Sequence, residues 1–265
     1  MHVIAELPVW LTAGFVVGIS LPAAWALCRL AWACTPFWHQ PGSNEIVGYA
    51  YGVFGMMYGV LLAFTIVGAW ERFVEAERIV VHEVTMLGEL WRDVKAFPPD
   101  VADGFHRDLI AYSQSVIDDE WPAMAALGQR SPKTQEIYEG LWERTYRLDP
   151  QTKLQEAFLA EILADINQLS ATRRLRVLHS RKEINGILWL VLFVGAVPTI
   201  GYTLMFANGN RAVQVLVTAS IILIVLLGIL VAMELQYPFT GEISIRPDAV
   251  ADLLESFRQR LGPAR

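Results

Sequence analysis

Four long stretches of the chain consist almost entirely of apolar residues, and each is long enough to cross a bilayer. An α-helix rises about 1.5 Å per residue, so about 20 residues span a hydrocarbon core of roughly 30 Å. The four predicted transmembrane helices lie at about 8–30, 46–70, 186–207 and 212–235. Only short segments separate the members of each pair, which predicts two transmembrane hairpins, at 1–70 and 186–236.

Most of the charged residues lie between the two hairpins, in residues 71–185. This segment holds 15 of the 21 Lys and Arg residues and 20 of the 27 Asp and Glu residues. Its apolar positions recur every three or four residues, which is typical of amphipathic helices. The predicted fold class is therefore all-α: a polytopic membrane protein whose two hairpins flank a cytoplasmic helical domain at 71–185 and precede a tail at 237–265.

The second transmembrane helix is expected to continue beyond the membrane. Past Trp70 the apolar positions follow one another with an average step of about 3.5 residues, and no proline interrupts the pattern before Pro98-Pro99. Those positions are Phe73, Ala76, Val80, Val84, Leu87, Trp91 and Val94. The pattern predicts one helix to about Phe97, then further helices at 101–120, at 132–147, from Asp149-Pro150 onward, and at 248–261.

Lys and Arg near the ends of membrane helices predict the topology, because cytoplasmic loops carry more of them. The loop 35–45 has none and the turn 208–211 has only Arg211, whereas basic residues border 71–185 at both ends. We therefore expect residues 71–185, both termini and the tail to face the cytoplasm.

The second transmembrane helix carries two stripes of interest. Four glycines recur every three or four residues and would let another helix approach closely: Gly48, Gly52, Gly55 and Gly59. A neighbouring stripe repeats at about 3.5 residues, as in helices wound around a common axis: Tyr51, Phe54, Tyr58, Leu61, Thr65, Gly68 and Arg72. The glycines are predicted to pack helices. The second stripe is predicted to line a pore, and the alternative is that it packs against the third transmembrane helix.

No residue pattern indicates an enzyme, a metal site or a cofactor. A Ser/His/Asp set, a P-loop and a dinucleotide fingerprint are all absent from the sequence, and the five histidines share no ligand spacing. Cys28 and Cys34, at i and i+6, point to different sides of a helix. The net charge of −6 and the lack of a basic stripe argue against a nucleic-acid partner.

Two charged clusters in the middle segment each have a simple interpretation. Asp118-Asp119-Glu120 is the only dense acidic run, and three adjacent acids on a helix point in different directions, so exposed helix surface is expected. The basic cluster before the third transmembrane helix, Arg173, Arg174, Arg176, Arg181 and Lys182, is expected to set orientation and touch lipid headgroups. The alternative is a cytoplasmic ion vestibule. Glu234, the only carboxylate within the four spans, is either functional or extended to the membrane surface.

Several short motifs resemble one family. They are VGAWERF at the end of the second span, Glu120-Trp121-Pro122, Arg173-Arg174-Leu175, Trp189, Gly195-Ala196-Val197, and Tyr237-Pro238-Phe239-Thr240-Gly241. The chain also has the order hairpin, cytoplasmic domain, hairpin. Together, this order and these motifs resemble the bacterial bestrophin-like membrane proteins, which are distantly similar in architecture to the bestrophin anion channels. The resemblance implies an oligomer with a chloride-conducting pore lined by the second helix. The acidic calcium clasp of bestrophins has no counterpart, because QYPFTGEISIRPD after the fourth span lacks an acidic run.

Two functions are therefore expected as alternatives. The first is a homo-oligomeric ion channel, with a pentamer as the first guess, passing chloride or small anions along the symmetry axis, since four helices leave little room for a pathway inside one subunit. Its partners would be membrane lipid, small inorganic ions and further copies of the chain. The second is a non-conducting membrane scaffold or sensor whose cytoplasmic helices bind a partner.

Overall fold

The fold was analysed in a computed structural model, which describes residues 8–34, 43–181, 186–206 and 210–261. All regular structure in these residues is helical. The helices are α2 (Val9–Cys34), α3 (Ser43–Asp93), η2 (Val94–Ala96), α4 (Pro99–Ser115), η3 (Val116–Glu120), α5 (Trp121–Leu127), α6 (Pro132–Tyr146), α7 (Lys153–Ser180), α8 (Gly186–Met205), α9 (Arg211–Leu235) and α10 (Asp248–Leu261). Four of them, α2, α3, α8 and α9, are long and apolar enough to span a membrane, which confirms the predicted fold class.

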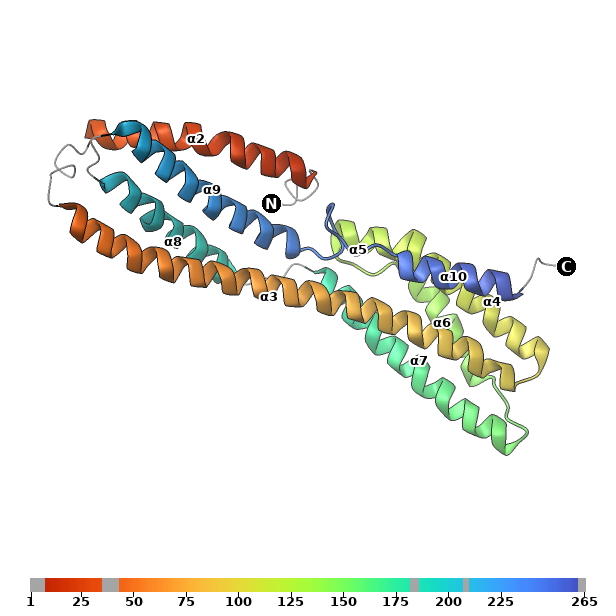
Figure 1. Cartoon of the computed structure of the whole chain (residues 1–265). Helices are drawn as coiled ribbons and strands as arrows, with labels where there is room; N and C mark the ends of the chain where they lie inside the picture. The colour runs from red at the N-terminus through yellow and green to blue at the C-terminus, as the bar shows by residue number, and fades with distance from the viewer. Residues whose placement is uncertain (1–7, 35–42, 182–185, 207–209, 262–265) are drawn as a thin grey trace. The chain divides into compact units, whose positions relative to one another are not determined.

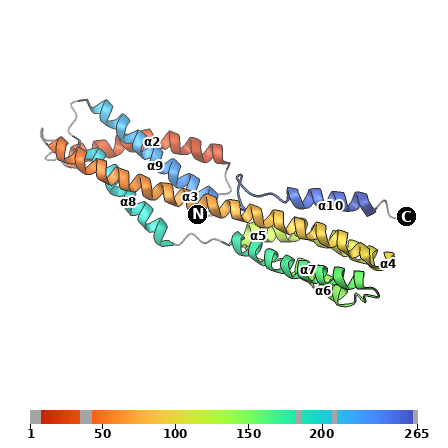
Figure 2. The ribbon, with the colours of Figure 1, turned by 60° about the horizontal axis from the view of Figure 1, so that its bottom comes forward.

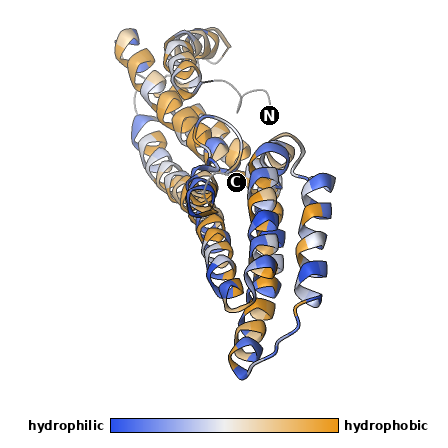
Figure 3. Ribbon diagram, turned by 90° about the vertical axis from the view of Figure 1, so that its right-hand side faces the viewer, coloured by the Kyte–Doolittle hydropathy of each residue, from blue (hydrophilic) through white to orange (hydrophobic). Residues whose placement is uncertain are grey.

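The chain forms two compact units, and each is described by itself. The membrane unit comprises Met1–Glu71, Glu183–Gln236 and Gly241–Ile243. The helical unit comprises Arg72–Lys182, Tyr237–Thr240 and Ser244–Arg265. In the view of Figure 3 the helices of the membrane unit are mostly hydrophobic, whereas hydrophilic and hydrophobic residues are mixed along those of the helical unit.

In the membrane unit, α9 packs against α2 on one side and against α8 and α3 on the other (Figures 1 and 2). On one side Ala219 and Ile222 of α9 contact Ala24 of α2. On the other side α9 and α8 form a cluster with Tyr58 and Leu62 of α3. Two glycines on the partner helices permit this approach, because a Cβ added at Gly195 would lie 2.9 Å from Tyr58 Cδ2, and one added at Gly228 would collide with Leu62. The close packing of α3 thus depends on glycines of α8 and α9.

The prediction that the second transmembrane helix continues far beyond the membrane is confirmed. α3 is one α-helix of 51 residues, and a 3₁₀ turn at Val94–Ala96 ends it just before Pro98-Pro99. Its C-terminal half belongs to the helical unit, where it packs with α4, α6, α7 and α10 around one core. The largest apolar side chains of that core include Leu87, Leu90, Trp91, Phe105, Leu109, Leu141, Ile162, Ile166 and Phe257.

Two predicted helix boundaries in the helical unit are wrong. The helix from Pro99 does not end at Glu120, because a π turn at Val116–Glu120 leads directly into α5, which tolerates Pro122 in its first turn and ends at Gly128 in a left-handed conformation. The following long helix begins at Lys153 rather than at Pro150, since the Thr152 hydroxyl caps it by accepting from the Gln155 N–H. The Ser131 cap of α6 is as expected.

Candidate functional site

The membrane half of α3 has one face that is buried within the chain and one that is open. Tyr58, Leu62, Thr65 and Ala69 are all less than 9% exposed. The opposite face consists of exposed residues: Tyr49, Gly52, Val53, Met56, Gly59, Val60, Ala63, Val67 and Trp70. Because a helix has 3.6 residues per turn, these positions form a continuous surface along the membrane half of α3.

Two members of the predicted pore stripe are buried in the described part of the chain. Tyr58 is 5% exposed and packs against α8 and α9, and Thr65 is 7% exposed. Leu61 packs on the same cluster. The rings of Tyr51 and Phe54 lie 6.2 Å from Phe206 and 5.3 Å from Tyr202 respectively. Phe54 remains 44% exposed, and Gly68 and Arg72 are half-buried.

The glycine stripe lies closer to the open face. A Cβ added at Gly52 or Gly59 would meet nothing within 4 Å in the described part of the chain. A Cβ at Gly48 would lie 3.7 Å from Phe206, and one at Gly55 would meet only Tyr51 of the same helix. Two of the four glycines, Gly52 and Gly59, therefore lie on the open face of α3.

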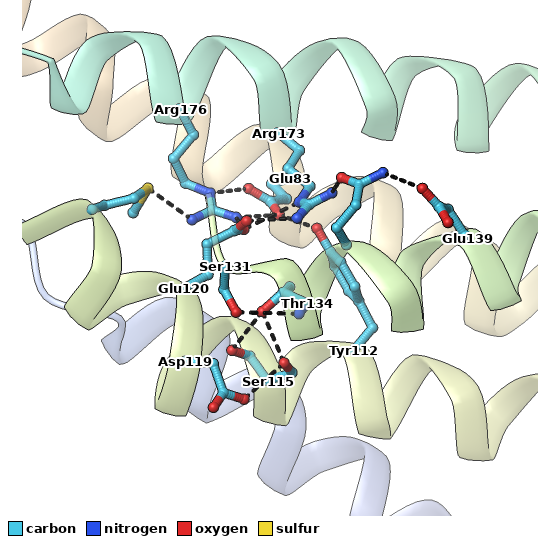
Figure 4. Close-up of polar contacts among 12 residues, drawn as sticks. Glu83, Tyr112, Ser115, Asp119, Glu120, Ser131, Thr134, Glu139, Arg173 and Arg176 are labelled. Atoms are coloured by element: carbon cyan, nitrogen blue, oxygen red, sulfur yellow. Dashed lines mark hydrogen bonds and ion pairs between the residues drawn. The ribbon is translucent and has the colours of Figure 1, made fainter. Parts of the chain in front are cut away.

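The helical unit contains a buried network of four charges (Figure 4). Arg176 of α7 donates from Nε to Glu83 Oε2 at 2.6 Å and from Nη2 to Glu120 Oε2 at 2.6 Å. Arg173, one turn earlier, binds Glu120 with Nη2 at 2.6 Å and Nε at 3.1 Å. Tyr112 donates its hydroxyl to Glu83 Oε1 at 2.7 Å. Two positive and two negative groups therefore balance.

The network is sealed from solvent, and the remaining donors also have partners. The Glu83, Glu120 and Arg176 side chains are at most 1% exposed, and Arg173 is 4% exposed. Arg173 Nη1 donates to Gln135 Oε1 at 2.6 Å, and Arg176 Nη1 to Met124 Sδ at 3.2 Å. Each guanidinium also lies over an aromatic ring, Arg173 over Tyr138 and Arg176 over Trp121. Buried charges are stable only when they are paired and fully hydrogen-bonded in this way.

The pKa values follow from this pairing. Burial alone would raise the pKa of Glu120, but Arg176 and Arg173 outweigh it, so the pKa of this carboxyl lies below its usual value. Burial would lower the pKa of Arg176, yet Glu83 and Glu120 raise it. Burial, reinforced by the charge of Glu83, holds the pKa of Tyr112 well above its ordinary value. Glu120 and Arg176 therefore stay charged at neutral pH, and the tyrosine stays protonated as a donor.

These positions correct two predictions. Glu120 is not exposed helix surface, because the π turn directs it inward, while Asp119 stays at the periphery with Lys133 at 2.9 Å. Arg173 and Arg176 touch neither headgroups nor a vestibule, since both are buried. Arg174 is exposed and Arg181 donates to the Gly128 carbonyl at 3.3 Å, while Lys182 lies outside the described residues.

A sequence signal for the network did exist. The buried positions of α7 run Ile162, Ile166, Leu169, Arg173, Arg176, with steps of three and four, so the apolar stripe continues into two arginines. Glu83 likewise falls between Val80 and Leu87 on the buried stripe of α3, where the sequence had suggested Val84. Charged residues in register with a core stripe indicate a buried ion pair.

The network offers no open position for a substrate or metal, because every charged group already has a partner. Among the described residues no group of three or more His, Cys, Asp or Glu side chains is arranged to hold a metal ion. In the membrane unit Glu234 is 4% exposed and lines a cavity of about 540 Å³ with apolar residues of α2, α3 and α9. The interpretation that Glu234 extends to the membrane surface is therefore wrong.

Comparisons with known proteins identify the family that has this architecture. A family model described as the bestrophin-like domain matches residues 19–250. A crystal structure of a bacterial bestrophin homolog from Klebsiella pneumoniae, carrying a single substitution, superposes with a TM-score of 0.70 at 17% identity, over 91% of this chain and 94% of that one. A second variant of that homolog gives a TM-score of 0.67 at 17% identity, over 91% and 98% of the two chains. No curated protein sequence matches. The match across most of its length shows that this chain belongs to the bestrophin-like family.

Proposed function

We propose that the chain forms a homo-oligomeric channel in the bacterial inner membrane that passes chloride or other small anions along an axial pore bordered by α3. The observation that carries this proposal is the open face of α3. One side of the helix is held by α8 and α9, whereas the other is apolar, exposed and free of contacts with described residues at Gly52 and Gly59. Membership of the bestrophin-like family supports the same arrangement.

Small residues on the open face suit close approach to the axis. Gly52, Met56, Gly59 and Ala63 are all exposed and follow one another with steps of four, three and four. Small residues at such spacing let membrane helices approach closely. Met56 has the largest side chain of the four and is 68% exposed, so it would form the narrowest, apolar ring of the pore.

Selectivity for anions is proposed to arise at the cytoplasmic end. Arg72 is the first basic residue after the membrane half of α3, and five or so copies around an axis would form a cationic ring. Arg173 and Arg176 do not contribute, because Glu83 and Glu120 neutralise them inside the subunit. Of the stripe first predicted to line the pore, Arg72 and the exposed part of Phe54 are retained in this proposal.

Ion flux from liposomes containing the purified full-length chain tests the proposal. Met56→Ala should widen the apolar ring and raise chloride flux, and Arg72→Glu should shift preference toward cations. Tyr58→Phe is the matched control, because its hydroxyl is buried and has no hydrogen-bond partner among the described residues, so flux should not change. If wild type conducts no ion under any gradient, the scaffold or sensor function replaces the channel.

Topology and subunit number have separate tests. In a chain with Cys28 and Cys34 replaced by serine, an impermeant thiol reagent added to whole cells should label a cysteine at Ser43 and miss one at Gln129. Native mass spectrometry should give a closed oligomer, with five copies as the expected number. A monomer in mild detergent and in membranes would contradict an axial pore.

A further inference from the structure

A second feature of the membrane unit lies away from α3, in a groove between α2 and α9. The groove has a volume of about 1000 Å³. Its lining residues are Leu21, Pro22, Trp25, Arg29, Trp32, Arg211, Ala212, Val215 and Leu216. The proposed channel uses none of them.

Two positively charged side chains, Arg29 and Arg211, line this groove. Arg29 and Arg211 are the only Lys or Arg residues in 1–70 and 186–236, and both line it. In the described part of the chain neither has a carboxylate within ion-pair distance. Each guanidinium instead lies over an indole, with Arg29 Cζ 5.0 Å from the Trp25 ring centre and Arg211 Cζ 4.8 Å from that of Trp32. A net double positive charge therefore remains for an anion to neutralise.

Hydrogen bonds hold the Trp32 ring in place. Trp32 Nε1 donates to Gln214 Oε1 at 3.0 Å. Gln214 is 3% exposed, and its Nε2 donates to the Leu204 carbonyl at 3.2 Å, at the end of α8. Three helices thus fix the ring over which Arg211 lies. A guanidinium held against an aromatic face has fewer rotamers to lose when it binds a ligand.

The groove is polar at one end and apolar along the rest. Arg29 lies five residues before the end of α2, and Arg211 is the first residue of α9, so both lie at the same end of the hairpin helices. Membrane arginines and tryptophans are stable at this depth because their polar groups reach the headgroup region. Leu21, Pro22 and Leu216 extend the walls away from the arginines with apolar surface.

We propose that this groove binds one anionic phospholipid, whose phosphate lies between Arg29 and Arg211 and whose acyl chain lies along Leu21, Pro22 and Leu216. Guanidinium groups bind phosphate through paired, charge-assisted hydrogen bonds. A zwitterionic headgroup is disfavoured because its cation would face two arginines. The shape and charge of the groove together match an amphiphile with an anionic head.

The fold also argues against a neighbouring subunit as the occupant. Ala219 and Ile222 of α9 face α2, whereas Val225 and Ile229 of α9 pack in the cluster with α3. If α3 borders the axis of a ring, the groove lies on the opposite side of the membrane unit, where lipid surrounds the oligomer. The lipid site does not depend on ion conduction.

Native mass spectrometry of the full-length protein tests the site. The protein is released from mixed micelles with equal amounts of phosphatidylglycerol and phosphatidylcholine, and retained lipid is counted. Wild type should retain phosphatidylglycerol preferentially. Arg29→Gln and Arg211→Gln should each weaken retention about fivefold, the factor expected from the loss of one arginine near an anionic headgroup. The double control Arg130→Gln and Arg147→Gln, at exposed positions of the helical unit, should retain lipid like wild type.

A second variant covers the case in which the arginine variants fold poorly. Leu216→Trp fills the apolar part of the groove and leaves both charges in place, so it should also reduce retention of phosphatidylglycerol. Equal retention of the two lipids by wild type, or unchanged retention in both arginine variants, would overturn the proposal. Displacement of the lipid by millimolar inorganic phosphate would show a simple anion site and would also overturn it. Cross-linking between subunits in the variant Leu216→Cys would also overturn the proposal, because it would identify the groove as a subunit interface.

Discussion

The two units of the molecule each hold a pair of arginines, and the pairs differ in how their charge is neutralised. In the helical unit Arg173 and Arg176 are buried, and two glutamates supplied by α3 and the π turn balance them. In the membrane unit Arg29 and Arg211 are exposed in a groove, each lies over an indole ring, and neither has a carboxylate within ion-pair distance in the described part of the chain. The chain therefore buries one pair of arginines completely and leaves the other pair accessible.

The difference shows why the number of basic residues alone does not identify an ion or lipid site. A buried pair with matched carboxylates has no remaining charge, so it stabilises a single arrangement of helices and attracts no anion. An exposed pair without carboxylates costs little, because solvent or headgroups surround it, and keeps its attraction for anions. The predictions below test this contrast, beginning with the largest expected effect.

Glu120→Gln should cause the largest loss of stability. It leaves Arg173 and Arg176 with one negative partner between them inside a sealed core, and breaking a buried pair costs about 3–5 kcal/mol. We expect a corresponding fall in the free energy of unfolding, measured by denaturant titration of the full chain in mild detergent. The neighbouring Asp119→Asn is the matched control, and its effect should be far smaller because Asp119 lies at the periphery. Equal effects of the two variants would refute the contrast.

Tyr112→Phe should have an intermediate effect. It removes the hydroxyl that donates to Glu83 Oε1 at 2.7 Å but preserves the ring and every ion pair. A hydrogen bond to a charged group contributes about 1.5–3 kcal/mol, so the free energy of unfolding should fall by that amount. Tyr146→Phe, at a position that is 73% exposed, should leave it unchanged. If Tyr112→Phe lowered the free energy of unfolding as much as Glu120→Gln does, the ion pairs would be lost as well. The tyrosine would then organise the network.

Arg29→Gln and Arg211→Gln should affect stability less than either change in the network. Each removes an exposed cation–π contact, which contributes about 0.5–1 kcal/mol, when no anionic lipid is added. With saturating phosphatidylglycerol the wild-type midpoint of thermal unfolding should rise and that of the double variant should not, since a ligand stabilises the state that binds it. A lipid-independent loss as large as that of Glu120→Gln would mean that these arginines are structural as well.

Asp165→Asn should have the smallest effect on the free energy of unfolding, and the effect should appear only as the pH rises above about 4. Burial, together with Glu89, Asp93 and Glu161, raises the pKa of Asp165 to about 6. The folded state therefore holds this proton at pH values where the unfolded state has lost it, and stability falls as pH rises from about 4 to about 6. Because Asp165 is partly exposed, solvent screening limits the loss to below about 1 kcal/mol.

The comparison for Asp165→Asn is therefore a pH series. The variant and wild type should unfold alike at about pH 3, where the carboxyl is protonated in both the folded and the unfolded state. The variant should become the more stable of the two as pH passes 6. A constant difference between them at all pH values would show that the carboxyl does not titrate in this range.

The helices could be predicted from the sequence because each depends on local pattern. Four long apolar runs define the membrane helices, and the absence of proline between Pro41 and Pro98 accounts for the length of α3. The Pro122 boundary failed for a physical reason: proline is tolerated in a first helical turn, and the preceding π turn reorients the chain without a recognisable composition.

The faces of α3 were harder to predict than its length. Glycine in a membrane helix indicates close approach, but the sequence does not say which helix approaches or from which chain. Here Gly195 and Gly228 receive Tyr58 and Leu62 inside the chain, while Gly52 and Gly59 remain open. Tyr58 packs against α8 and α9 inside the chain, which its stripe alone did not indicate, because the packing partner of a stripe is a tertiary property. Arg173 and Arg176 would have been found by extending the apolar stripe of α7.

The balanced network also constrains how such a protein can change during evolution. Losing one of Glu83, Glu120, Arg173 and Arg176 leaves an uncompensated buried charge, whereas replacing all four with apolar residues of similar volume can be neutral or stabilising. Single substitutions at these positions should therefore be purged, and divergent descendants should retain the whole set or lose it together. The four sites would then be inherited as one unit, although α3, the π turn and α7 contribute them from distant parts of the chain.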